Sequence, residues 1–201
     1  MIKELNILIT GVGGQGVILM SELLGNSAVK DGVRIRGSEV LGMAVRGGSV
    51  FSTIRMGSDV YGPLTPLGKC HILVGMEPSE VLRNITYLSK SSLVLLNTAI
   101  IVPFTVPLGQ SKYPSLEVIE EKLESASSKI VKLNANQIAR GAGNLLTANI
   151  VMLGALFGTE QLPIKIETIK ESIAERFPDK VVPVNIKAFD LGYQTCQQAL
   201  K

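Results

Sequence analysis

The chain has 201 residues, of which 46% are hydrophobic and 18% charged, with a net charge of +3. This length suits one α/β domain with a sizeable core, and this composition argues against disorder. The small net charge, the absence of Trp and the lack of a long basic run argue against nucleic-acid binding. Residues 145–157, the most apolar later segment, are too few to span a bilayer. Because no signal peptide is recognised either, we expect a cytoplasmic protein without membrane contact.

The two cysteines, Cys70 and Cys196, lie far apart in sequence, and His71 is the single histidine. These residues are too few for a four-thiolate iron–sulfur site or a four-ligand zinc site. Cys70 and His71 are neighbours in an expected strand, where adjacent side chains point to opposite faces. We therefore expect two reduced thiols and a hydrogen-bonded structural histidine, without a thiolate–imidazole catalytic pair.

A glycine-rich turn near the N-terminus is the most informative segment. Residues 5–9 form an apolar run that predicts a strand, and residues 17–30 carry apolar positions at helical spacing. The turn between them fits the G-x-G-x-x-G pattern at Gly11, Gly13 and Gly16. A strand, a glycine turn and a helix N-terminus together present backbone N–H groups to an anion. Three alternatives stay open: a dinucleotide site, a site for another anion such as the pyrophosphate of coenzyme A, and a purely structural turn.

Residues 33–36 predict a second strand, which would complete a strand–helix–strand unit with parallel strands and a right-handed crossover. A dinucleotide-binding fold places an acid at the end of this strand to hold the ribose 2′-OH. Here the strand ends in Arg36, and the nearest acid is Glu39. Arg36 suits a phosphorylated ribose, so a free-standing NADP- or flavin-dependent oxidoreductase stays open as an alternative function.

Residues 37–48 hold four glycines, one acid and one arginine, and predict a loop with at most one helical turn. Arg46, beside two glycines, is a guanidinium on a mobile backbone that can reach a carboxylate or a phosphate. The alternative is that Arg46 binds a neighbouring acid and tethers the loop. Residues 49–55 predict the next strand, with an optional hairpin back to residues 60–61, and Arg55 ends it as a second cation.

The rest of the chain alternates strands with helices. Strands are predicted over residues 71–75, 92–97 and 129–133, and helices over 77–88, 116–125, 134–140, 144–158, 166–177 and 184–200. Residues 98–114 contain three prolines and predict an extended loop. The pattern predicts a three-layer, Rossmann-like α/β fold with a mostly parallel sheet and a helical C-terminal third, in which residues 1–201 form one domain. Asn149, inside the most apolar helix, predicts a buried contact with a loop, with a polar site residue as the alternative.

Several motifs together resemble a known family. They are the Gly11–Gly16 turn, the Gly42–Val50 segment with Arg55 after it, and Asn149 five residues before Gly154. The combination resembles the gamma-type subunit of 2-oxoacid:ferredoxin oxidoreductases from residue 5 to about 192. Within that family, Pro63–Pro66 and Gly75–Glu80 resemble the small (beta) subunits of indolepyruvate:ferredoxin oxidoreductases.

The resemblance implies a subunit of an enzyme of anaerobic metabolism that oxidatively decarboxylates a 2-oxoacid, here an aryl pyruvate, to an acyl-CoA. The complete enzyme uses thiamine diphosphate, magnesium and [4Fe–4S] clusters, and it passes electrons to ferredoxin. In the family these groups lie on other subunits or domains, so this chain would be inactive alone and would pack against a thiamine-diphosphate and iron–sulfur partner subunit. An isolated chain with an uncovered partner surface is expected to form a homodimer.

The resemblance also assigns roles to residues of the two glycine-rich segments. The phosphate-facing or interface turn would comprise Gly11, Gly13, Gly14, Gln15 and Gly16, and the loop toward the shared site would comprise Arg46, Gly47, Gly48 and Ser49. Val45 departs from the family, in which Gln is often found at this position. No catalytic residue and no metal ligand is expected in this chain. A module that binds coenzyme A or a nucleotide without chemistry is a further alternative.

Overall fold

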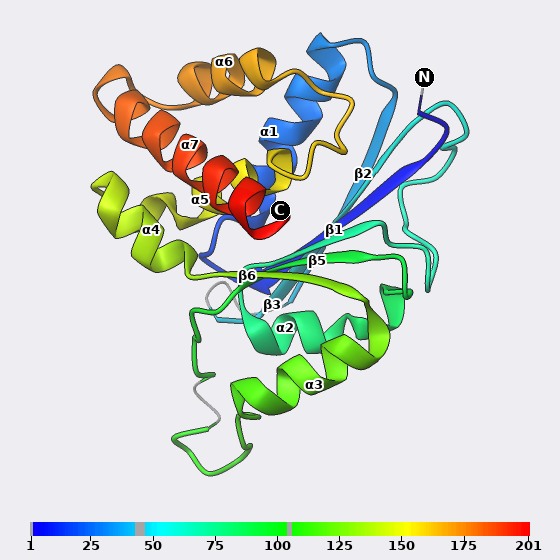
Figure 1. Ribbon diagram of the computed structural model, residues 1–201, viewed down its shortest axis with the longest axis vertical. Coiled ribbons are helices and arrows are strands. Elements are labelled where there is room, and N and C mark those ends of the chain that lie inside the picture. Colours follow the sequence, from blue (N-terminus) through cyan, green and yellow to red (C-terminus); the bar gives the residue numbers. More distant parts are fainter. Residues whose placement is uncertain (1, 43–46, 104–105) are drawn as a thin grey trace.

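The structure is a computed structural model that describes residues 2–42, 47–103 and 106–201. Within these residues, six strands form one sheet in the order β2-β3-β1-β4-β5-β6 (Figure 1). The strands are β1 (Leu5–Val12), β2 (Ile35–Leu41), β3 (Ser49–Met56), β4 (Ile72–Gly75), β5 (Leu93–Asn97) and β6 (Lys129–Leu133). Strands β1, β4, β5 and β6 are parallel, and β3 is antiparallel to both of its neighbours. The predicted mostly parallel sheet is confirmed.

Helices cover both faces of the sheet and give three layers (Figure 1). One face carries α1 (Val17–Lys30), α4 (Ala135–Ala142), α5 (Ala148–Phe157), α6 (Ile166–Arg176) and α7 (Val182–Ala199), and the other carries α2 (Pro78–Arg83) and α3 (Leu116–Ala126). Short 3-10 turns lie at Ile85–Tyr87, Leu145–Thr147 and Asp179–Val181. The elements described after β6 are all helical, so the helical C-terminal third is confirmed.

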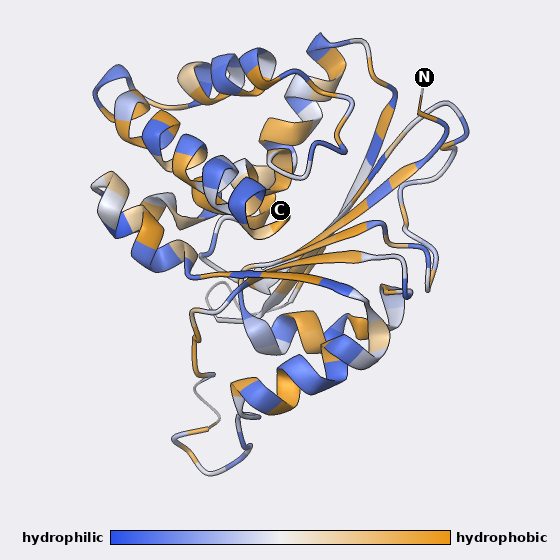
Figure 2. Ribbon diagram, viewed as in Figure 1, coloured by the Kyte–Doolittle hydropathy of each residue, from blue (hydrophilic) through white to orange (hydrophobic). Residues whose placement is uncertain are grey.

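The core lies where both faces of the sheet are covered. Every residue of β1, β4 and β5 is buried, as the continuous apolar runs of these strands predict. Figure 2 shows the hydrophobic residues along these strands. Helix α5 packs closely on α7, because a Cβ on Gly154 would overlap the Phe189 backbone and a Cβ on Gly192 would overlap the Val151 backbone. Among the described residues, no helix is long and apolar enough to cross a membrane.

The second strand differs from its prediction in length and in place. β2 includes residues 37–41, which were expected to be loop. β3 returns along β2 as a hairpin and lies between β2 and β1, so the first two strands run parallel, as predicted, but they are not neighbours in the sheet. The side chains explain the order: β3 buries Val50, Ile54 and Met56, whereas most side chains of β2 are exposed, which suits an edge strand.

The segment after β3 also differs from its prediction. Residues 60–61 belong to no strand, so the optional hairpin is wrong. Instead, Ser58 N donates to Ile2 O and Asp59 N donates to Lys3 O, which packs this turn against the N-terminus. Two predicted helices are shorter than expected: residues 77–88 divide into α2 and a 3-10 turn, and residues 144–158 into a 3-10 turn and α5. The other predicted elements are present with small shifts of their ends. The described parts of the 98–114 loop contain neither helix nor strand, as predicted.

Candidate two-loop site at the carboxyl edge of the sheet

The glycine turn lies at the edge where the parallel strands end. α1 follows β1 on one face of the sheet and α2 follows β4 on the other, so the neighbouring strands β1 and β4 form a topological switch point. Open α/β sheets bind ligands outside the carboxyl ends of their strands at such a point. Gly14 has a φ of 98° and Gly16, which precedes α1, has a φ of 80°. Because L side chains rarely adopt these angles, glycine is favoured at both positions.

Backbone hydrogen bonds join the glycine turn to the second glycine-rich loop. Gly13 N donates to Gly48 O at 2.8 Å, and Gly47 N donates to Gly13 O at 3.2 Å. Ser49 then pairs with Val12 in the β1–β3 ladder. The structure therefore brings together the two segments that the sequence singled out, residues 11–16 and 47–49. The predicted site residue Arg46 and the departure at Val45 lie outside the described residues.

Gln15 faces the inside of this edge. Its Oε1 accepts from Val12 N at 2.8 Å, and its Nε2 donates to Met76 O at 2.8 Å. A Cβ on Gly11 would lie 2.7 Å from Gln15 Oε1, so glycine leaves the space that the carboxamide fills. Gln15 thus bridges the switch point between β1 and β4. These two hydrogen bonds hold the Gln15 side chain against the backbone of the turn and of the segment after β4.

The N-terminus of α1 directly follows the glycine turn and is open, in that no described side chain caps it. α1 has no side-chain cap and no acid in its first turn. Asn149, which is 7% exposed, lies against Gly16, where a Cβ would overlap its Nδ2. Asn149 is therefore buried against the glycine turn, as predicted, but no hydrogen bond to the described residues of the turn caps it. Asn149 Oδ1 accepts from Ile150 N, while within residues 2–42, 47–103 and 106–201 its Nδ2 has no hydrogen-bond partner. A helix N-terminus with a free amide donor beside it favours an anion.

The geometry overturns the dinucleotide alternative. Arg36 is level with Arg55 and Asn6 in the sheet register, at the start of β1. Five steps along β1 lead from Asn6 to Gly11, and Arg36 is two strands away from β1, so the Arg36 backbone lies at least about 16 Å from the glycine turn. Glu39 is on edge strand β2, with β3 between it and β1. Neither residue is placed to hold a ribose at the turn, because the antiparallel β3 occupies the position that the second strand has in a dinucleotide fold.

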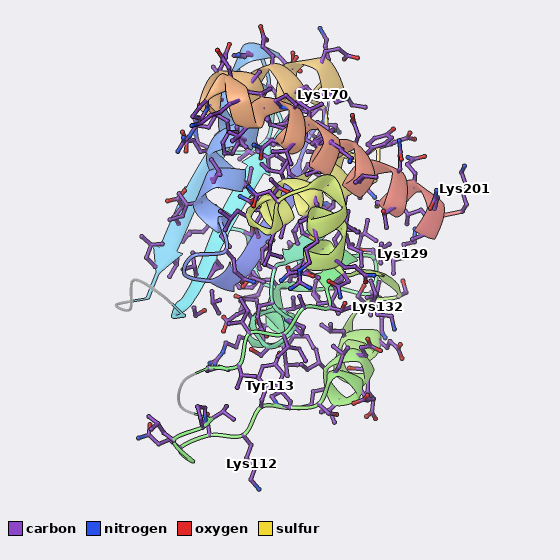
Figure 3. All side chains as sticks on the ribbon, turned by 90° about the vertical axis from the view of Figure 1, so that its left-hand side faces the viewer. Lys112, Tyr113, Lys129, Lys132, Lys170 and Lys201 are labelled. Atoms are coloured by element: carbon purple, nitrogen blue, oxygen red, sulfur yellow. The ribbon has the colours of Figure 1, made fainter. Side chains whose placement is uncertain are left out.

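Glu77 is a fully buried carboxylate that organises the end of β4. Its Oε2 accepts from Ser79 N, Ser79 Oγ and Glu80 N, which caps α2. Its Oε1 accepts from Ile101 N at 3.4 Å and from Tyr113 Oη at 2.5 Å. Burial, together with this bond to Glu77, raises the pKa of the Tyr113 hydroxyl. Glu77 therefore binds both ends of the 98–114 loop, which projects from this edge with Lys112 pointing outward (Figure 3).

Asn97 closes the adjacent strand end and was not singled out by the sequence. Its Nδ2 donates to Met76 O at 3.1 Å, the same acceptor that Gln15 uses. Its Oδ1 accepts from Ala99 N and from Ala135 N. An Asn directly after a continuous apolar strand was the available signal, because a buried carboxamide at a strand end must find partners there.

Three residues weighed for chemistry have structural roles. Arg55 binds Asn6 Oδ1, Glu4 Oε1 and the Gly62 and Leu64 carbonyls, so it is not a free cation at the site. His71 Nδ1 accepts from Asn6 N at 2.9 Å, as predicted for a structural histidine. Burial raises the pKa of the Cys70 thiol to about 12, which makes it unreactive. The described residues contain no cluster of three or more His, Cys, Asp or Glu side chains that would hold a metal ion.

Comparisons with known proteins agree with this geometry. The family model described as "Pyruvate ferredoxin/flavodoxin oxidoreductase" matches residues 6–195. Indolepyruvate oxidoreductase subunit IorB of Pyrococcus horikoshii is 45% identical over 199 residues, which cover 98% of each chain. The gamma subunit of a keto/oxoacid ferredoxin oxidoreductase from Geobacter sulfurreducens has the same fold, with a TM-score of 0.70, 23% identity and coverage of 97% of this chain and 99% of that one. A 2-oxoglutarate:ferredoxin oxidoreductase from Magnetococcus marinus contains the fold within a longer chain, with a TM-score of 0.76, 18% identity and coverage of 98% and 32%.

Proposed function

Because the chain belongs to the pyruvate ferredoxin/flavodoxin oxidoreductase family and is a subunit of a 2-oxoacid:ferredoxin oxidoreductase, we propose that its own part is to supply the coenzyme A side of the shared active site. The observation that carries this proposal is the pair of glycine loops, hydrogen-bonded to each other beside the open N-terminus of α1. The family matches confirm the predicted resemblance. The two loops are the place in the fold that we propose for the coenzyme A side.

The residues at this edge fit the phosphates of coenzyme A. α1 offers N–H groups without a competing acid in its first turn, and Asn149 Nδ2 adds a neutral donor. Polyphosphate groups bind such helix ends through backbone N–H groups and the helix dipole. We propose Gly11, Gly13, Gly14, Gln15 and Gly16 with Arg46, Gly47, Gly48 and Ser49 as the coenzyme A side. In this arrangement Gln15 shapes the turn and the glycine backbones face the phosphates.

In the proposed reaction, coenzyme A supplies the thiol that accepts the acyl group of the decarboxylated 2-oxoacid. The residues of this chain bind and orient the acceptor. Orienting a reactant in this way lowers the entropic part of the barrier. Thiamine diphosphate, magnesium and the [4Fe–4S] clusters would be held by the partner subunit, which would also pass electrons to ferredoxin.

The partner subunit would cover the same edge of the sheet. Exposed aliphatic side chains gather there, at the end of β2, at the start of the 98–114 loop and before α5: Val40, Leu41, Ile100, Ile101, Val102, Leu145 and Leu146. Exposed apolar patches of this kind mark protein–protein surfaces. Without its partner the isolated chain would form a homodimer through this surface. A cytoplasmic location and one domain over residues 1–201 are part of the same proposal.

The relative from Pyrococcus horikoshii is named for indolepyruvate, so we propose an aryl pyruvate as the 2-oxoacid. The test is purification of the tagged chain with its native partner, followed by assay of ferredoxin reduction with a panel of 2-oxoacids and coenzyme A. Reduction that needs both coenzyme A and an aryl pyruvate supports the proposal. Recovery of the chain alone, or activity that needs no coenzyme A, would contradict it.

A matched pair of variants tests the location of the coenzyme A side. Gly14 is exposed, and a Cβ placed on it meets no atom within 4 Å. Asn and Asp tolerate positive φ better than other side chains and differ here mainly in charge. In the assembled enzyme, Gly14→Asp should raise the KM for coenzyme A by about tenfold more than Gly14→Asn, through repulsion of the phosphates. Equal KM values of the two variants for coenzyme A would show that coenzyme A does not bind at this edge of the sheet.

A further inference from the structure

One buried carboxylate outside the two glycine loops fixes the second loop. Glu80 lies in the first turn of α2, and its side chain is 5% exposed. Its Oε2 accepts a hydrogen bond from Ser49 Oγ at 2.5 Å, and its Oε1 lies 3.1 Å from Arg83 Nε. Hydrogen bonds to a charged acceptor are shorter and stronger than neutral ones. Glu80 therefore constrains Ser49 more strongly than a neutral partner would.

Ser49 is the residue at which the second loop leaves the sheet. Its carbonyl accepts from Gly42 N at 3.1 Å, which closes the base of the loop. Gly47 and Gly48, directly before it, make the two backbone hydrogen bonds to Gly13. The orientation of Ser49 thus decides how these glycines lie against the glycine turn.

Glu80 is itself fixed to the strand that carries the glycine turn. Asn84 Nδ2 donates to Glu80 O and to Thr10 Oγ1, both at 2.9 Å. Thr10 is in β1, immediately before Gly11. Because its backbone is tied to β1 and its carboxylate to Ser49, Glu80 links the ends of two neighbouring strands from one side of the sheet.

We propose that Glu80 is a positioning residue for the coenzyme A side: through Ser49 it sets the second loop against the glycine turn. This inference rests on the proposed function and adds to it a residue from the motif Gly75–Glu80, which the two loops do not include. The Glu80 carboxylate is buried, and Ser49 is the one residue of the described parts of the two loops to which it is bonded.

The test uses the assembled enzyme and separates the two substrates. Glu80→Ala should raise the KM for coenzyme A by about tenfold, with kcat and the KM for the 2-oxoacid within about twofold of wild type. Glu80→Gln keeps an acceptor oxygen for Ser49 Oγ and should restore most of the affinity. Arg83→Ala is the matched control, because Arg83 shares the carboxylate but has no hydrogen bond or ion pair with residues 47–49.

Ser49→Ala provides a second variant, since Ser49 is exposed and its replacement spares the core. It should reproduce the effect of Glu80→Ala, and the double variant should be no worse than either single one, because both remove the same bond. A normal KM for coenzyme A in both single variants, or an equal rise of both KM values, would overturn the inference. If Gly14→Asp raises this KM while Glu80→Ala and Ser49→Ala do not, the positioning role fails and the proposed function stands. If Gly14→Asp does not raise the KM for coenzyme A more than Gly14→Asn does, the proposed function fails, and the positioning role of Glu80 fails with it.

Discussion

Two loops at the carboxyl edge are each tied to helix α2 by one carboxylate, and the two attachments differ. Glu77 binds the 98–114 loop with a carboxylate that accepts five hydrogen bonds from backbone and side-chain donors. Glu80 binds the second loop, of which the structure describes residues 47–49, through the Ser49 hydroxyl, and it shares its charge with Arg83, whose side chain is 65% exposed. Burial raises the pKa of Glu80, although the hydrogen bond from Ser49 and the charge of Arg83 act in the opposite direction.

Glu77 is therefore a structural attachment (an anchor) for its loop, whereas the attachment at Glu80 can be changed without loss of the core. Every donor around Glu77 would lose its partner if the carboxylate were removed, so that attachment is part of the folding core. The attachment at Glu80 is a single bond at the base of a loop that we assign to ligand binding. Loops that bind ligands are commonly drawn from the less stable parts of a fold.

Removal of the Glu77 carboxylate should lower the free energy of unfolding more than any other change proposed for this edge. Glu77→Ala leaves buried donors unsatisfied and removes the cap of α2, so the free energy of unfolding should fall by about 4 kcal/mol. Thermal denaturation should show a Tm about 10 °C lower. Glu121→Ala, an exposed position in α3, is the control and should shift the Tm by less than about 2 °C. If Glu77→Ala lowers the Tm by no more than the control does, the Glu77 carboxylate is not a structural attachment.

A second comparison lies within the glycine turn. Gly16→Ala combines strain at positive φ with an overlap on Asn149 Nδ2, so it should cost about 3 kcal/mol. Gly14→Ala has the strain without the overlap and should cost about 1 kcal/mol. Urea denaturation measures both. Equal losses would show that Asn149 does not restrict the turn.

Two carboxamides at the carboxyl edge, those of Gln15 and Asn97, donate to the same oxygen, Met76 O. Asn97 is fully buried and also holds Ala99 N and Ala135 N, so Asn97→Ala should cost about 2 kcal/mol. Gln15 is partly exposed, so Gln15→Ala should cost about 1 kcal/mol. The double variant should be non-additive, because both side chains donate to one oxygen. Strict additivity in denaturation would contradict the shared acceptor.

The smallest expected effect is a pH dependence from Glu80. Because its pKa in the folded state lies above the ordinary 4.5, its contribution to stability is fully present below that value. The contribution is lost as the pH rises through the raised pKa. The stability of wild type relative to Glu80→Gln should therefore fall as the pH rises above 4.5. Denaturation curves across this range check the sign, and a constant difference would contradict it.

The sequence predicted those parts of the fold that depend on local pattern. The continuous apolar runs of β4 and β5 and the glycine turn before α1 appear where they were expected. The position of β2 in the sheet could not be predicted in this way. It depends on which of the two strands, β2 or β3, buries more apolar side chains next to β1, and this is a property of the whole sheet. A β-hairpin forms a more local pairing than a crossover, and here it displaces the parallel neighbour.

The sequence predicted the glycines of the candidate site, but it did not predict the hydrogen bonds that hold the two loops in place. Positive φ and close approach leave a clear signature at Gly14 and Gly16. The roles of Gln15, Glu80 and Asn97 depend on partners 30 or more residues away, such as Met76 for Gln15 and Ser49 for Glu80. Such contacts become visible only once the strand order is known.

The most direct test of the central claim is hydrogen–deuterium exchange on the assembled enzyme with and without coenzyme A. If the two glycine loops form the coenzyme A side, residues 11–16 and 47–49 should exchange more slowly when coenzyme A is bound, while α6 on the far side of α1 should not change. Protection confined to the partner subunit, with these two segments unchanged, would contradict the claim.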